Sequence, residues 1–155
     1  MQDKWLDITL NKLDKACSKQ NDKTLLKFKT KSFRKVIKRV AQFSEQSCKK
    51  CTACRAGIYD CIEIISKYKG DRKEFKHYNT IIKNIVIHLK KVHGLIEEGY
   101  YMVMFFPLGM CLGVIVNVLY PDRVGYTLAL AVGTGFGLSI GTLLDQVAKK
   151  KGRVI

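Results

Sequence analysis

Four cysteines in the middle of the chain are the residues whose type and spacing could best carry out chemistry. Cys48, Cys51 and Cys54 form the pattern C-x-x-C-x-x-C, and Cys61 follows at a longer interval. Clustered thiolates can hold a zinc ion in a tetrahedron or an iron–sulfur cluster. The first three match the start of a bacterial ferredoxin run, but Ile62 stands where that run would have proline. We therefore predict that these four cysteines are candidate ligands of zinc or of an iron–sulfur cluster.

A second interpretation of the same segment is an ordinary buried helix. Cys51, Cys54, Ile58, Cys61 and Ile65 fall within one arc of a helical wheel, where a free cysteine behaves as a small hydrophobic residue. A straight helix also cannot wrap three thiolates spaced by three residues around one ion, although a break near Ser47 or Gly57 would permit it. Core packing, metal binding and redox sensing all stay open at this point.

Other residues with catalytic potential are few. The three histidines are His77, His88 and His93, and the last two are five residues apart, whereas a metal-binding pair on one helix is usually four apart. We predict that they are surface or core residues. Because the sequence also shows neither a nucleotide-binding glycine loop after a strand nor a serine–histidine–aspartate arrangement, we do not expect an enzyme.

The elements that must position these residues are helices. Apolar residues recur at helical spacing from Trp5 to Cys17, from Thr24 to about Ser47, from about Cys48 to Tyr68 and from Asp71 to Val92. Gly70 and Gly94 mark the ends of the last two helices. No stretch has the period of two that a strand needs. The sequence thus predicts an all-α fold, with a bundle of about four helices over residues 1–95.

The charges are divided unevenly along the chain. The formal net charge is +15, and residues 100–144 contain Asp122 and Arg123 as their only Asp, Glu, Lys or Arg. On the second predicted helix the basic residues gather opposite the apolar stripe, and we expect this face to contact anionic lipid or a protein partner. These residues are Lys27, Lys31, Arg34, Lys35 and Lys38. Because no aromatic side chain is interleaved with them, binding of nucleic acid is the weaker alternative.

Two uncharged stretches, residues 101–119 and 126–144, are long enough to cross a bilayer as helices. A short junction at residues 96–100 precedes this predicted transmembrane hairpin over 101–145, and the turn at residues 120–125 connects its helices. Residues 146–155 form a basic tail. Because basic residues flank the hairpin on one side and the first 30 residues contain no signal-like apolar run, we expect a two-pass protein of the cytoplasmic membrane with both termini in the cytoplasm.

Glycines recur every four residues on both predicted spans, and residues four apart share one helix face. They are Gly109 and Gly113 on the first span and Gly133, Gly137 and Gly141 on the second. Over residues 100–144 the chain resembles glycine-zipper membrane hairpins. The resemblance implies close helix packing and oligomers, but no activity.

The leading interpretation is a membrane-anchored interaction or effector protein that lies in the lipid bilayer and packs as a homo-oligomer or against a membrane-protein partner. No small-molecule substrate is indicated. A membrane metal or iron–sulfur protein that uses the four cysteines is the first alternative, and a membrane-tethered nucleic-acid binder is the second.

Overall fold

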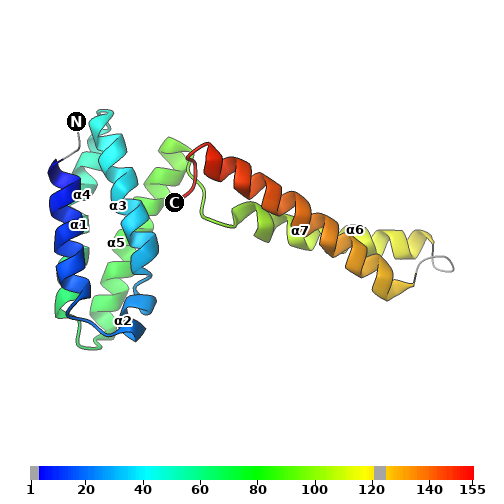
Figure 1. Ribbon diagram of the computed structural model, residues 1–155, viewed down its shortest axis with the longest axis horizontal. Coiled ribbons are helices and arrows are strands. Elements are labelled where there is room, and N and C mark those ends of the chain that lie inside the picture. Colours follow the sequence, from blue (N-terminus) through cyan, green and yellow to red (C-terminus); the bar gives the residue numbers. More distant parts are fainter. Residues whose placement is uncertain (1–3, 121–124) are drawn as a thin grey trace. The chain divides into compact units, whose positions relative to one another are not determined.

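The computed structural model describes residues 4–120 and 125–155, and within these residues the fold is all-α, as predicted. The first compact unit ends at Gly94 and contains five helices (Figure 1). They are α1 (Lys4–Cys17), α2 (Asp22–Lys27), α3 (Thr30–Glu45), α4 (Lys49–Lys67) and α5 (Arg72–His93). The second unit, Leu95–Val154, contains α6 (Tyr100–Leu119) and α7 (Tyr126–Lys150).

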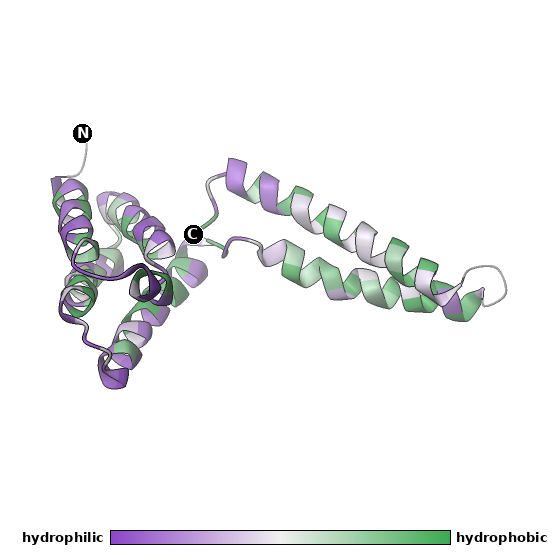
Figure 2. Cartoon of the chain, turned by 60° about the horizontal axis from the view of Figure 1, so that its bottom comes forward, coloured by the Kyte–Doolittle hydropathy of each residue, from purple (hydrophilic) through white to green (hydrophobic). Residues whose placement is uncertain are grey.

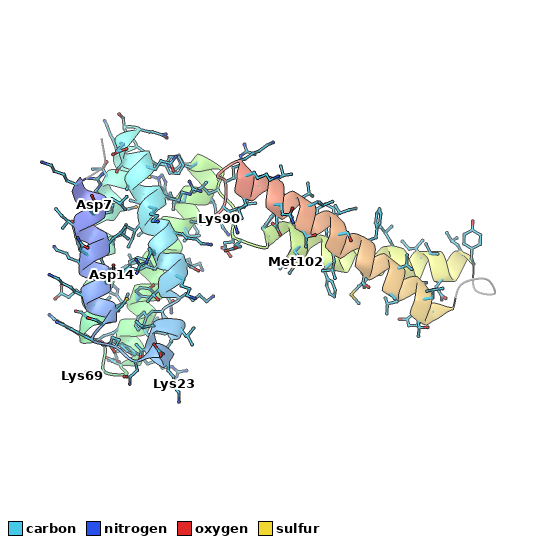
Figure 3. The ribbon with its side chains drawn as sticks, in the orientation of Figure 1. Asp7, Asp14, Lys23, Lys69, Lys90 and Met102 are labelled. Carbon is cyan, nitrogen blue, oxygen red and sulfur yellow. The ribbon has the colours of Figure 1, made fainter. Side chains whose placement is uncertain are left out.

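Helix α4 is the central element of the first unit, because it packs against α1, α3 and α5. Its buried residues are Cys51, Ile58, Cys61, Ile62 and Ile65, which form one stripe at helical spacing. Opposing stripes on the neighbouring helices complete a core of large apolar side chains, including Leu13, Phe33, Ile37, Val40 and Leu89. Hydrophilic residues are frequent along the helices of the bundle (Figure 2), and charged side chains such as Asp7 and Lys69 lie on its outside (Figure 3).

One predicted helix is interrupted. We expected a continuous helix from Thr24 to Ser47, but α2 ends at Lys27 and α3 begins at Thr30. Between them Lys29 has a left-handed φ of 47°, and Phe28 is buried against the rings of Tyr68, Phe75 and Tyr78. The break turns Phe28 into the core, and the Tyr78 hydroxyl donates to the Phe28 carbonyl at 2.8 Å. Tertiary burial of one aromatic residue therefore overrides local helical spacing here.

In the second unit α6 and α7 pack closely through small residues. A methyl group added to Gly113 would lie 2.5 Å from the Ala129 carbonyl oxygen, and one added to Gly141 would lie 2.7 Å from the Met102 Cα. Gly109, Gly133 and Gly137 face backbone atoms of the opposite helix in the same way. Both helices are long and apolar enough to cross a membrane, and only 11% and 22% of their spans are buried. Most of the predicted turn, residues 121–124, lies outside the described residues.

Polar contacts also join the ends of this hairpin. The Asp145 carboxylate on α7 accepts hydrogen bonds from the backbone N–H groups of Tyr101 and Met102 at 3.1 and 3.0 Å. These donors belong to the first turn of α6, where helical N–H groups lack partners within the helix. Asp145 therefore caps α6 from the neighbouring helix. Beside it, Lys149 pairs with Glu98 at 3.7 Å.

Candidate metal site

The end of helix α3 determines where the first candidate ligand lies. Ser47 has a left-handed φ of 65° and its N–H donates to the Ser44 carbonyl at 3.2 Å. The Cys48 N–H donates to the Phe43 carbonyl, also at 3.2 Å. This pair of hydrogen bonds is the Schellman ending of a helix. It leaves Cys48 in an extended conformation as the N-cap of α4 and Cys51 in the first turn of that helix.

Helix α5 brings two histidines to the same place. The short turn at residues 68–71 makes α4 and α5 antiparallel neighbours, so the beginning of α4 lies beside the end of α5. The end of α5 is set by Gly94, which has a left-handed φ of 62° and donates to the Lys90 carbonyl at 3.1 Å. His93 is the last residue before this glycine, and His88 precedes it by more than one turn.

The two cysteines and two histidines form one compact group. Their Sγ and ring nitrogen atoms all lie within 4.8 Å of one another. His88 Nε2 is 3.5 Å from Cys48 Sγ and 3.4 Å from Cys51 Sγ, and His93 Nε2 is 3.3 Å from Cys51 Sγ. Cys51 is buried, while the other three side chains are half-buried.

This spacing and donor set fit a single tetrahedral metal ion. Zinc binds cysteine sulfur at about 2.3 Å and histidine nitrogen at about 2.0–2.1 Å, so sulfur and nitrogen ligands of one tetrahedral ion lie about 3.5–3.6 Å apart. Three of the four sulfur–nitrogen distances, 3.3–3.5 Å, are close to that value, and the fourth pair, Cys48 and His93, lies within 4.8 Å. Two cysteines with two histidines are also a common ligand set of structural zinc sites.

The electrostatics of the group favour the protonation states that bind a metal at Cys48 and His88, and disfavour the thiolate of Cys51. Hydrogen bonding from the Cys51 backbone lowers the pKa of Cys48, which favours its thiolate. Burial, with the charges of His93 and Lys50, lowers the pKa of His88 and keeps the imidazole neutral. Burial raises the pKa of Cys51 to about 12. A bound cation would overcome that last effect, because it deprotonates a coordinating thiol directly.

The structure separates the four cysteines predicted as ligands. Cys48 and Cys51 belong to the group, whereas Cys54 and Cys61 do not. Cys54 lines a groove of about 550 Å³ together with Gly57, Ile81 and His88. Cys61 is completely buried in the bundle core, where burial raises its pKa to about 12. Cys61 therefore occupies the position that the core-packing interpretation predicts for it.

The sequence did not indicate that His88 and His93 belong to this group, because their five-residue separation was compared with the spacing of a metal-binding pair on one helix. A different signal was present in the sequence. Cys48 and His93 lie at nearly equal sequence distances from the turn at residues 68–71, as do Cys51 and His88. In an antiparallel pair of helices, such residues face each other. The spacing across the turn, and not the spacing along one helix, was the informative quantity.

The basic residues predicted to contact lipid or nucleic acid lie on the outer surface of the first unit. Lys27, Lys31, Arg34, Lys35 and Lys38 are all exposed. Two of them also contact side chains of other helices or turns of the bundle. Arg34 pairs with Asp14, and the Lys27 ammonium donates to the Tyr68 hydroxyl at 2.6 Å and lies 4.5 Å from the centre of the Phe75 ring.

Comparison with known protein families gives a match to part of the chain. A family model described as the NADH-ubiquinone oxidoreductase-F iron-sulfur binding region matches residues 35–94. This segment contains most of α3 and the whole of α4 and α5, and it includes every residue of the Cys–His group. Neither the curated proteins nor the solved structures contain a match to the chain. The matched region and the Cys–His group thus both point to a metal or iron–sulfur centre in the first unit.

Proposed function

We propose that this is a membrane-associated metal-binding protein in which Cys48, Cys51, His88 and His93 hold one tetrahedral ion, with zinc as the preferred metal. The observation that carries the proposal is the convergence of four ligand atoms within 4.8 Å from two different helices. Four protein ligands would leave zinc no open position for a substrate, so the role of the ion is to tie the start of α4 to the end of α5.

The membrane part of the proposal rests on α6 and α7. Large apolar side chains cover the outside of this hairpin, among them Val103, Val118 and Phe136, which are 72%, 69% and 61% exposed. Burying such side chains in lipid removes them from water. The basic bundle and tail favour the cytoplasmic side of an inner membrane, by the excess of lysine and arginine that marks cytoplasmic segments.

The test is the metal content of the full chain, purified in detergent without oxygen. We expect about one zinc per chain, as four ligands for one ion require. Cys48→Ser and His88→Asn each remove one ligand and should lose most of the metal. Cys111→Ser and His77→Asn are matched controls outside the group and should keep it. A metal-free wild type, or ligand variants that retain the metal, would contradict the proposal.

An iron–sulfur cluster is the second candidate function, and two observations favour it. The matching family model is that of an iron–sulfur binding region, and Cys48, Cys51 and Cys54 keep the regular spacing of a cluster motif. Cys54 and His88 line the same groove. In this alternative the three cysteines, with a histidine of α5 as the fourth ligand, would hold the cluster, and the protein would carry electrons or sense redox state.

Cys54→Ala separates the two candidates. Cys54 lies outside the Cys–His group, so a single ion should stay bound in this variant. A cluster held by three cysteines should be lost or strongly reduced. Iron, acid-labile sulfide and visible absorbance that disappear with Cys54→Ala would establish the cluster. Zinc that is unaffected by this change would establish the single ion.

The interaction role expected from the sequence stays a prediction. Liposome binding that falls with salt would test contact between anionic lipid and the exposed Lys27, Lys31, Arg34, Lys35 and Lys38 face. The mass of the detergent-solubilised protein would test the expected homo-oligomer.

A further inference from the structure

Phe43 makes two separate contacts with the Cys–His group although it offers no ligand atom. Its backbone carbonyl accepts the hydrogen bond of Cys48 N–H at 3.2 Å. Its ring stacks on the His93 ring, with 3.8 Å between the ring centres and 16° between the ring planes. One residue at the end of α3 therefore contacts a ligand at the start of α4 and a ligand at the end of α5.

The first contact acts through the backbone. Together with the hydrogen bond from Ser47 to Ser44, it ends α3 and directs the chain into α4. Any side chain at position 43 can make it, because the carbonyl is present in every amino acid. The position of Cys48 should therefore survive substitution of the Phe43 side chain.

The second contact depends on the flat ring. An imidazole that binds a metal must be held at a defined rotation, because its lone pair lies in the plane of the ring. His93 is the last residue of α5, where a helix end gives a side chain less support than the middle of a helix does. Phe43 covers one face of this ring, and the edge-on ring of His88, at 5.2 Å, limits its movement from another direction.

We infer that Phe43 is a positioning residue of the metal site, whose ring holds the His93 imidazole in the plane that points Nε2 toward Cys51 and the shared ion. This inference rests on the proposed metal site. It adds a third helix to that site, because α3 then contributes to the orientation of a ligand although it supplies none.

The experiment measures cobalt binding to the full chain in detergent, since cobalt(II) reports tetrahedral coordination through its visible spectrum. Phe43→Leu keeps an apolar side chain and the carbonyl but removes the flat face. We expect about a tenfold loss of Co²⁺ affinity, at the lower end of the effect of changing groups that orient a metal ligand. We also expect an altered cobalt spectrum. Phe43→Tyr retains the stacking ring and should restore both.

Phe33→Leu is the matched control. Phe33 is a buried aromatic residue of the same helix, but its ring contacts Tyr78. Its loss should lower the thermal stability of the bundle and leave the cobalt spectrum unchanged. Circular dichroism shows whether each variant is folded, and Phe43→Met, which is closer to phenylalanine in volume, replaces Phe43→Leu if that variant is unfolded.

The possible outcomes separate this inference from the proposed function. If wild type binds cobalt and Phe43→Leu binds it equally well with the same spectrum, Phe43 does not position His93, and the metal site stands. If Phe43→Tyr behaves like Phe43→Leu, the ring face is not the cause, and the inference also fails. If wild type binds neither cobalt nor zinc, both proposals are wrong.

Discussion

The helices of the bundle and the helices of the hairpin pack in opposite ways. In the bundle α1–α5, large side chains such as Phe28, Phe33 and Ile37 fill the interior, and charged side chains face outward. In the hairpin, glycines lie between α6 and α7, and many large apolar side chains are exposed. Figure 2 shows that hydrophobic residues predominate along this hairpin. Helices are therefore stabilised by burial of apolar area in one unit and by close backbone contact in the other.

The hairpin should be the unit most sensitive to a single added side chain. Gly133→Leu places a large side chain against the backbone of Gly109 and Gly113, so the two helices must separate. We expect loss of the cooperative thermal unfolding of the hairpin in detergent, measured by circular dichroism, since even modest overpacking costs about 1–3 kcal/mol. Gly135→Leu is the matched control, because a methyl group at Gly135 has no atom within 4 Å.

Removal of the proposed metal ion should affect the bundle and not the hairpin. An ion bound to the folded state stabilises it by about 4 kcal/mol when its free concentration is 1,000 times the dissociation constant. A strong chelator should therefore destabilise the bundle and leave the stability of the hairpin unchanged. Hydrogen exchange of the backbone amides, measured separately in each unit, checks this. Equal protection of α4 and α5 with and without chelator would show that the ion does not support the fold.

Alkaline pH should also weaken the bundle selectively. Burial raises the pKa of Cys61 from 9.0 to about 12 and raises that of Tyr78 above its usual range. Below pH 9 the Cys61 thiol is neutral in both the folded and the unfolded chain. Between pH 9 and about 12 it ionises only in the unfolded chain, so the free energy of unfolding falls as the pH rises. Urea midpoints at pH 8 and pH 10.5 measure this loss, which Cys61→Ala should reduce.

Removal of the Asp145 carboxylate, which joins the two helices of the hairpin, should have a smaller effect on stability. Asp145→Ala leaves two N–H groups at the start of α6 without their acceptor and removes a negative charge from the positive end of that helix. We expect a cost of about 1–2 kcal/mol. Hydrogen exchange at the amides of Tyr101 and Met102 should accelerate. Asp145→Asn retains one acceptor oxygen, so its exchange rate should lie between those of Asp145→Ala and wild type. Equal exchange rates in all three proteins would show that the cap contributes nothing to stability.

Most of the fold could be predicted from the sequence, because apolar periodicity and glycine signals are local. Gly70 and Gly94 follow the ends of α4 and α5 as expected, and the two uncharged stretches form α6 and α7. The break at Phe28 and Lys29 could not be predicted in this way. It depends on three aromatic rings from distant parts of the chain, which no local pattern contains.

The candidate site was predicted only in part, for a related reason. Cys48 and Cys51 carry a recognisable spacing, whereas His88 and His93 acquire their meaning from the antiparallel neighbour across the turn. Sequence spacing along one helix cannot reveal a site that two helix ends form together. The proposed role of Phe43 is even harder to predict from residue spacing, because Phe43 lies on a third helix and contacts His93 through the face of its ring.

The smallest expected difference is in metal affinity, and it compares the turn that ends α5 with another turn whose glycine also has a positive φ. Gly94 and Gly70 both have a positive φ, 62° and 106°, and a methyl group at either has no atom within 4 Å. Alanine at each position should cost about 1–2 kcal/mol through backbone strain alone. Gly94→Ala should in addition weaken metal binding, because His93 is the neighbouring residue, whereas Gly70→Ala should leave it unchanged. Equal metal affinity in the two variants, measured by chelator competition, would mean that the position of His93 does not depend on how α5 ends.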